Sequence, residues 1–231
     1  MNSGKRTFWV DGPDEASSGS WEGQTEERFV KDVLRDHLWP FGIDAVPKVA
    51  TTKRIKRGPD FKGGITHYQK VENDLRRLLG DTAVVSVTTF IDYHALPHDF
   101  PGMVSRPNGS SLERARHVER AWERKIGDHH FRAYLMLHEF EALLFVNPEE
   151  LSTALHQPST LPQLQSIRSS FSTPEEINEN PESAPSKRIL QLLPGYQKTL
   201  HGPLLTKRVG LEAIRPECPH FNAWLGWLEV L

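Results

Sequence analysis

Apolar residues at helical spacing predict a long helix near the start of the chain, preceded by a short strand. Residues 7–10 (TFWV) predict the strand, and the polar, Gly-rich segment that follows them predicts a loop. From Thr25 onwards the apolar positions recur every three or four residues, which is the period of an amphipathic helix. Thr25 fits the N-cap position, and Pro40 predicts that the helix ends near Trp39.

The same alternation of strand and helix continues along the chain. Residues 45–52 predict a second strand, and residues 66–80 predict a helix that closes at Gly80. Residues 83–91 (AVVSVTTFI) are apolar on both faces, which is typical of a buried parallel strand.

Two further segments complete the first part of the chain. Residues 111–126 predict a charged helix, and residues 131–145 begin as a strand and change to helical spacing near Glu139. Repeated strand–helix units favour an α/β fold, so we expect residues 1–150 to form a core with a central, mostly parallel sheet flanked by helices.

The second part of the chain has a different composition. Residues 156–186 are rich in Ser, Pro, Glu and Gln and show little periodicity. Short helices are predicted at 162–170, 186–193 and 204–213, and the tail FNAWLGWLEVL predicts a further apolar helix. We expect residues 151–231 to be a helical C-terminal region packed on the core.

Composition narrows the class of protein. Hydrophobic residues make up 37% of the chain and charged residues 25%, as in an ordinary globular protein. Cys218 is the single cysteine, and no apolar run is long enough to span a bilayer, so the sequence predicts a cytoplasmic protein without membrane contact. The net charge of −2 argues against a protein that coats nucleic acid nonspecifically, although a local nucleic-acid site remains open.

Acidic residues stand at the predicted ends of strands. Glu22 precedes the first long helix, Asp92 follows the buried strand, and Glu139 and Glu141 follow the strand near residues 132–137. In an open α/β sheet such positions converge on one edge, where carboxylates can hold a divalent cation such as Mg²⁺. Each of them is also compatible with a plain structural role, as a helix-dipole partner or a turn residue.

Other candidates carry weaker signals. Histidines 94, 98, 129, 130 and 138 do not follow the spacing of a structural zinc site. Cys218 and His220 could form a nucleophile pair, but a packed small residue is the commoner meaning of such a cysteine. The basic stretch at 53–57 and the Lys62-Gly63-Gly64 segment could contact phosphate, and both also fit a solvated loop.

The string EGQTEERF resembles the first Toprim motif of nucleases of the overcoming-lysogenization-defect type. Over nearly its whole length the chain also resembles domain-of-unknown-function family 4276, which is Toprim-like. Seven blocks in order carry this resemblance: EGQTEERFV, FKGGITHYQKVENDLRRLL, VTTFIDYHALPHDFPG, LHEFEALLF, PEEINENPESAPSKRI, PGYQKTLHGPL and CPHFNAWL.

The resemblance implies a Toprim-like core whose acidic residues bind Mg²⁺ or Mn²⁺. Glu22 matches the first motif, and Asp92 matches the first acid of the DxD motif, whose second position is His94 here. Glu141, with Glu139 beside it as a spare ligand or base, resembles the acidic element that follows a later strand. The histidine departs from the family pattern and weakens a two-metal mechanism, because imidazole is a poor ligand for Mg²⁺.

The resemblance also implies basic helpers and a partner. Lys187, Arg188 and Lys198 resemble residues that neutralise a scissile phosphate. Lys198 is the first choice, and we expect it to lie close to the carboxylates of Glu22, Asp92 and Glu141. The sequence has no P-loop motif, so the ATPase with which such proteins work in bacterial anti-phage defence would be a separate ABC- or AAA-type chain.

The first acidic ligand has two candidates. The residues just before Glu22 (SSGSW) make a poor strand, whereas TFWV leads into Asp11. Either residues 11–20 are an insertion after the first strand or Asp11 replaces Glu22. Glu22 is favoured because EGQTEERF runs straight into a helix.

These expectations define two functions. The first is a metal-dependent nuclease subunit that cleaves DNA or RNA with water activated by the metal. The second is a non-catalytic regulatory or toxin-like subunit that keeps the fold and binds an ATPase or a phage protein. The sequence leaves open whether the chain forms a homo- or hetero-oligomer.

Overall fold

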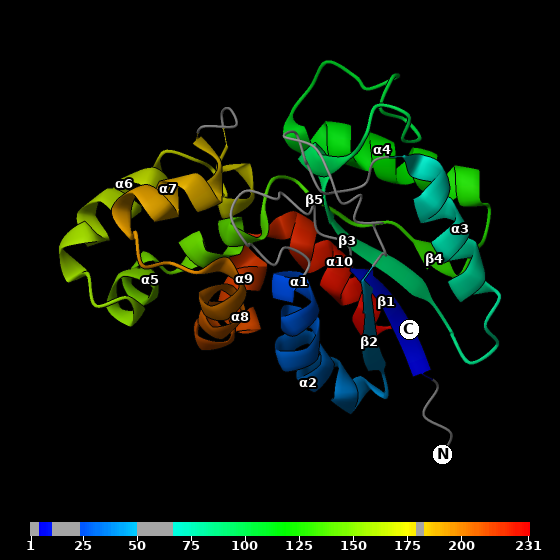
Figure 1. The fold of residues 1–231 in the computed structure, drawn as a ribbon, viewed down its shortest axis with the longest axis horizontal. Helices are drawn as coiled ribbons and strands as arrows, with labels where there is room; N and C mark the ends of the chain where they lie inside the picture. The colour runs from blue at the N-terminus through cyan, green and yellow to red at the C-terminus, as the bar shows by residue number, and fades with distance from the viewer. Residues whose placement is uncertain (1–4, 11–23, 50–66, 179–182) are drawn as a thin grey trace, which may run out of the picture.

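The computed structural model describes residues 5–10, 24–49, 67–178 and 183–231. A parallel sheet lies at its centre with the strand order β2-β1-β3-β4, and β5 also pairs with β3 (Figure 1). The strands are β1 (Lys5–Val10), β2 (Asp44–Val49), β3 (Val87–Asp92), β4 (Phe131–Arg132) and β5 (Leu135–Met136). The α/β class with a parallel sheet and C-terminal helices is therefore confirmed.

Helices cover both faces of the sheet. Successive side chains of β3 point to opposite faces and pack against different helices. Val87 and Ile91 face α3 (Tyr68–Leu79) and α4 (Ser111–Ile126) in one hydrophobic cluster. Phe90 belongs to a second cluster on the opposite face, formed with the first helical segment and with α9 (Leu211–Glu217) and α10 (Pro219–Glu229). The last helices of the chain thus complete the core of the sheet.

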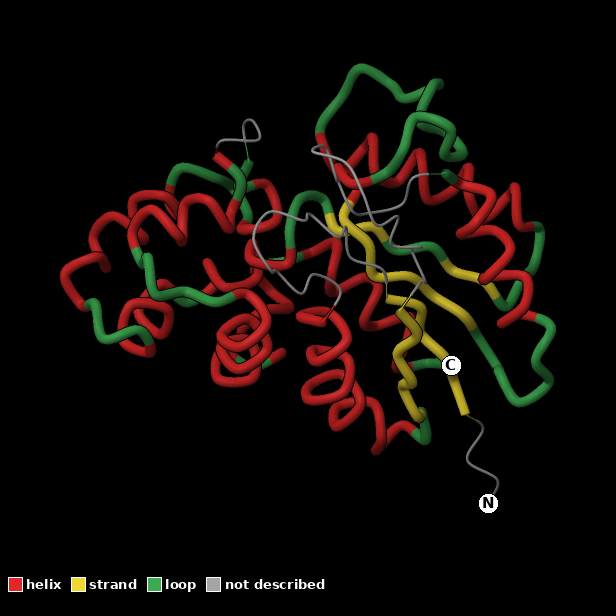
Figure 2. The backbone as a smooth tube through the Cα atoms, viewed as in Figure 1, coloured by secondary structure: helices red, strands yellow, loops and turns green. Residues whose placement is uncertain are grey.

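A third hydrophobic cluster lies beside the sheet, on the left in Figures 1 and 2. It is formed by the 3₁₀ helix η4 (Phe140–Val146), α5 (Pro148–Ala154), α6 (Leu161–Ser169), α7 (Pro185–Leu192) and α8 (Lys198–Val209). Residues 151–231 therefore contribute to two clusters: α5–α8 form the lateral helical lobe, and α9 and α10 pack on the sheet.

The edge strand is split at a side chain of its neighbour. The Thr89 hydroxyl donates to the Tyr134 carbonyl at 2.9 Å and accepts from the Tyr134 N–H at 2.9 Å. Because these bonds replace the regular ladder, β4 and β5 are two short strands rather than one. This is the reason that the strand predicted within residues 131–137 appears in two pieces.

Other boundaries differ from the prediction for local reasons. The first helix contains α1 (Gln24–Phe29), a π-helical turn η1 (Val30–Leu34) and α2 (Arg35–Leu38), so Thr25 lies inside α1 and the predicted N-cap is wrong. The helix predicted at 204–213 is two helices, because Gly210, with φ of 80°, separates α8 from α9.

Helix α8 packs closely on α1 because residue 202 is glycine. A Cβ atom at Gly202 would lie 2.9 Å from Thr25 Cγ2 and 3.2 Å from a ring carbon of Phe140. A larger residue would push the two helices apart. The contact holds the N-terminal ends of α1 and α8 near η4, where the acidic residues described below are found. Among the described residues, no helix is long and apolar enough to cross a membrane.

Candidate active site at the carboxyl end of β3

Asp92 is the last residue of β3 and lies at the carboxyl end of the sheet. Its Oδ1 atom is buried and accepts no hydrogen bond from the described residues. Burial raises the pKa of Asp92 well above its usual range, and the nearby carboxylates of Glu26, Glu139 and Glu141 raise it further. Asp92 is therefore a partly buried acid with one fully buried oxygen, and its negative charge is poorly compensated by the protein.

Glu139 lies between β5 and η4 in extended backbone. Its Oε2 accepts a hydrogen bond of 2.8 Å from the backbone N–H of Ser186, in the first turn of α7. Its Oε1 lies 4.0 Å from Nζ of Lys198, the first residue of α8. Two segments of the helical lobe therefore hold the carboxylate of Glu139, which is still 26% exposed.

Glu141 lies in the first turn of η4 and is buried. Tyr196 donates a hydrogen bond of 3.3 Å to its Oε1 atom. Burial raises the pKa of Glu141, as does the charge of Glu139, whereas Lys198 and the hydrogen bond from Tyr196 lower it. The lysine and the phenol thus partly offset the cost of placing this carboxylate inside the protein.

Glu26 is the fourth acid of this group, and the sequence prediction missed it. It is 8% exposed in α1, and its charge raises the pKa of Asp92. A signal was present: Glu26 precedes Phe29, Val30 and Val33 by three, four and seven residues, so it lies on the apolar face of the helix. This signal competes with the commoner role of an acidic residue in the first turn of a helix, which is to interact with the helix dipole.

We call Glu26, Asp92, Glu139 and Glu141 the acidic cluster. Lys198 adds a cation at its edge, and its charge lowers the pKa of both Asp92 and Glu141. The N-terminal ends of α7 and α8 point towards the same place, since Ser186 and Lys198 both contact Glu139. The position of Lys198 agrees with the expected proximity, and its role in chemistry stays a prediction.

Two histidines lie beside the acidic cluster. The rings of His94 and His138 stack with centroids 4.8 Å apart and an interplanar angle of 10°. Burial lowers the pKa of His138 to about 3, with added effects of His94 and Arg114. Burial and the charges of Arg114 and Arg106 also lower the pKa of His94, against the opposing effect of Glu139. Burial thus disfavours the protonated form of both rings.

The remaining predicted residues either fall outside the described residues or make other contacts. Glu22 and its alternative Asp11 fall outside the described residues, as do the basic stretch at 53–57 and the segment at 62–64. Lys187 is exposed on α7. The Arg188 guanidinium donates to the Ser183 carbonyl at 2.7 Å and lies over the ring of Phe171, which indicates a structural role.

The structure also describes the histidines and the cysteine that were considered as metal ligands or as a nucleophile. Among the described residues, three potential ligand atoms come within 4.8 Å of one another only at Asp128, His129 and His130, a turn between α4 and β4 in which both histidines are exposed. The acidic cluster is thus more open than a formed metal site. Cys218 is fully buried and burial raises the pKa of its thiol, so it is a packed core residue rather than a nucleophile.

A protein-family model matches most of the chain. The model of the family described as "Domain of unknown function (DUF4276)" matches residues 21–229. The chain therefore belongs to this family, as the seven sequence blocks indicated. Neither the curated proteins nor the solved structures give a match.

Proposed function

We propose that this protein is a divalent-metal-dependent phosphodiesterase, a nuclease subunit that acts on DNA or RNA. The observation that carries the proposal is Asp92, whose buried Oδ1 has no partner among the described residues while three further carboxylates surround it. A protein rarely buries such a group unless something else compensates it. The carboxyl end of a parallel sheet is also the usual place of a site in an open α/β fold.

The residues present fit a divalent cation. Carboxylate oxygens are the ligands of hard cations such as Mg²⁺ and Mn²⁺, and burial raises the pKa of both Asp92 and Glu141, so a cation would stabilise their charged forms. Asp92, Glu141 and Glu26 would hold the ion, and Glu22 remains a candidate outside the described residues. When bound, such a cation supplies positive charge to a phosphoryl oxygen and lowers the pKa of water.

The protein's own groups provide the other requirements of phosphodiester hydrolysis. The Lys198 ammonium lies at the edge of the acidic cluster and could contact a non-bridging phosphate oxygen as negative charge develops there. Glu139 is partly exposed and is held by the Ser186 N–H, so it could accept a proton from an attacking water molecule. The N–H groups in the first turn of α7 add to the positive potential at this place.

His94 gives the site a preference among metals. It stands at the second position of the DxD motif, two residues after Asp92, and its lowered pKa favours the neutral ring. A neutral imidazole binds first-row transition metals better than it binds Mg²⁺. The proposal therefore favours Mn²⁺ over Mg²⁺ as the activating ion.

The biological setting rests on the resemblance to Toprim-like nucleases alone. On that resemblance we propose that the protein acts in the bacterial cytoplasm in an anti-phage defence system that includes a separately encoded ATPase. Co-purification of the chain with an ABC- or AAA-type ATPase encoded beside it tests this part.

The catalytic proposal is tested by incubating the purified chain with plasmid DNA and with tRNA in Mn²⁺, Mg²⁺ or EDTA. We expect cleavage of at least one substrate with Mn²⁺ and none with EDTA. Glu26→Gln should reduce cleavage strongly, whereas Glu27→Gln should not, because Glu27 is the next residue of α1 and pairs with Lys31 at the surface.

Binding of Mn²⁺ measured by calorimetry gives a readout that does not depend on activity. If the wild-type chain neither binds Mn²⁺ nor cleaves nucleic acid in the presence of its ATPase, the nuclease proposal is wrong. The non-catalytic binding subunit is then the better description.

A further inference from the structure

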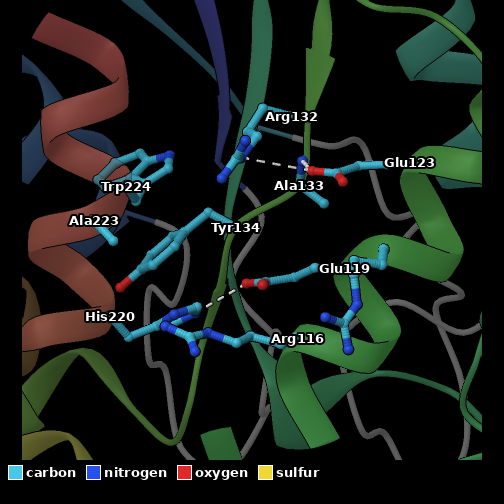
Figure 3. Close-up of a pocket in the computed structure, with 10 residues that line it drawn as sticks. Arg116, Glu119, Glu123, Arg132, Ala133, Tyr134, His220, Ala223 and Trp224 are labelled. Atoms are coloured by element: carbon cyan, nitrogen blue, oxygen red, sulfur yellow. Dashed lines mark hydrogen bonds and ion pairs between the residues drawn. The ribbon is translucent and has the colours of Figure 1, made fainter. Parts of the chain in front are cut away.

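An open cavity of about 320 Å³ lies at the outer edge of the sheet, on the far side of β4 and β5 from β3. It is lined by residues of α4, by residues 132–134 and by residues of α10 (Figure 3). None of the residues that line it belongs to the acidic cluster. Its volume falls within the range of small-molecule sites, ~300–1,000 Å³.

The two carboxylates that line the cavity are occupied by protein donors. Glu119 Oε1 accepts a hydrogen bond of 2.8 Å from the Leu135 N–H and lies 3.0 Å from His220 Nε2. Glu123 Oε1 accepts from the Ala133 N–H at 3.1 Å. These acids cover the open edge of the split strand, a position where unpaired N–H groups would otherwise invite another strand. They are structural groups and do not need a cation.

The arginines of the cavity have fewer protein partners than its carboxylates. Arg116 and Arg120 lie one turn apart on α4 and are exposed, and neither makes a hydrogen bond with the described residues. The charge of Arg120 lowers the pKa of Glu123. Arg132 lies 3.7 Å from Glu123 and over the ring of Trp227. Figure 3 shows the guanidinium groups of Arg116 and Arg132 directed towards α10. The cavity thus has three guanidinium groups and two carboxylates that are already hydrogen-bonded.

Aromatic rings form the inner wall of the cavity. The ring of Tyr134 stacks on Trp224 with centroids 4.4 Å apart and an angle of 16°, and on His220 at 5.1 Å and 27°. All three residues are buried, and Figure 3 shows Tyr134 between the strand and α10. Because these rings already stack on one another, a ligand would contact their edges rather than a free ring face.

We propose that this cavity binds a nucleotide, with its phosphate held by Arg116 and Arg120 and its base against the wall formed by Tyr134 and Trp224. Guanidinium groups bind phosphate oxygens through paired, charge-assisted hydrogen bonds, and both side chains are exposed at the mouth of the cavity without a hydrogen bond to the described residues. The same chemistry belongs to a free mononucleotide and to the terminal nucleotide of a nucleic-acid strand.

The test is binding of AMP to the full chain, measured by calorimetry in EDTA. Two comparison ligands are measured in the same way: inorganic phosphate and a 5′-phosphorylated oligonucleotide of about twelve nucleotides. We expect AMP or the oligonucleotide to bind and the Arg116→Ala/Arg120→Ala double variant to bind at least about tenfold more weakly, the scale of losing one charge-assisted contact. Arg124→Ala should bind like the wild type, because Arg124 is an exposed residue of α4 that does not line the cavity.

Comparison of the ligands identifies the source of the nucleotide, and a variant of the acidic cluster tests whether the two sites are independent. Tighter binding of AMP supports a free nucleotide, and tighter binding of the oligonucleotide supports a strand end. Asp92→Asn should bind AMP like the wild type even if the nuclease proposal fails. The inference is overturned if no ligand binds at millimolar concentration, if phosphate binds as tightly as AMP, or if Arg124→Ala weakens binding as much as the double variant.

Discussion

Tyr196 donates a hydrogen bond to Glu141 across 3.3 Å, and this contact joins the helical lobe to the acidic cluster. Both side chains are buried, so the hydrogen bond forms where water competes little. The tyrosine precedes α8, and Lys198 begins that helix, so one turn of chain brings a phenol and an ammonium to the same carboxylates. The helical lobe is thus part of the candidate site.

Replacing Tyr196 with phenylalanine removes this hydrogen bond with little change in volume. A hydrogen bond to a carboxylate favours the charged form, so its loss raises the pKa of Glu141 further. If cleavage requires ionised Glu141, the acidic limb of the pH–rate profile should move to higher pH in Tyr196→Phe. An unchanged acidic limb in a folded variant would remove Glu141 from the list of ionised groups required for catalysis.

Asp92→Asn should stabilise the metal-free protein at alkaline pH. Burial raises the pKa of Asp92, so the wild-type folded state is favoured below the unfolded pKa and loses stability as pH rises through the folded pKa. Asparagine does not titrate, so its advantage should be larger at pH 8 than at pH 5. In EDTA we expect the melting temperature to rise by about 2–4 °C at pH 8, which is roughly 1 kcal/mol for a chain of this size.

The same variant tests the metal site by its response to Mn²⁺. A cation that binds the folded state raises the melting temperature of the wild type by mass action. Asp92→Asn should lose most of that increase. Equal stabilisation of the two proteins by Mn²⁺ would place the ion elsewhere, with the exposed turn at Asp128, His129 and His130 as the first alternative.

Lys198→Ala should reduce cleavage by about a hundredfold, the scale of removing one transition-state donor. Lys207→Ala is the matched control, because Lys207 lies on the same helix and its Nζ is 3.7 Å from Asp36 at the surface. Circular dichroism should be the same for both variants. Full activity of Lys198→Ala would leave the lysine a structural partner of Glu139.

His94→Asp restores the second acid of the DxD motif and should change metal preference. An additional carboxylate suits Mg²⁺, whereas the native imidazole suits transition metals. The ratio of cleavage with Mn²⁺ to cleavage with Mg²⁺ should therefore fall. His98→Asp, an exposed position in the following loop, should leave the ratio unchanged. A ratio that is the same in both variants would show that His94 does not contact the ion.

Glu175→Gln should destabilise the packing of α10 on the sheet. The buried Glu175 carboxylate accepts hydrogen bonds of 2.9 Å from the N–H groups of both His220 and Phe221, in the first turn of α10. Glutamine offers one acceptor and turns an N–H₂ group towards a donor, which costs about 1–3 kcal/mol. Denaturant unfolding measures the loss, and Glu176→Gln provides the comparison, with a change of less than about 0.5 kcal/mol.

Local sequence determined the elements of the core and the positions of several candidate residues. The helices at residues 68–79 and 111–126 follow from their apolar periodicity, and α4 begins with a capping box at Ser110 and Glu113. Asp92 and Glu139 could be placed at the ends of strands because strand ends are marked by a change in local pattern. The family was likewise evident from ordered blocks of sequence, and its matched region is confirmed.

Only the tertiary structure decided which of these residues meet. The sequence places Glu26 on the apolar face of its helix, but which groups it meets there depends on the packing of α8 on α1 at Gly202. Tyr196 and Ser186 reach the acidic cluster from segments with little periodicity, and the split of the edge strand depends on the Thr89 side chain of its neighbour. Such contacts join residues far apart in the chain, and the periodicity that predicts helices and strands records which face of an element is buried but not what packs against it.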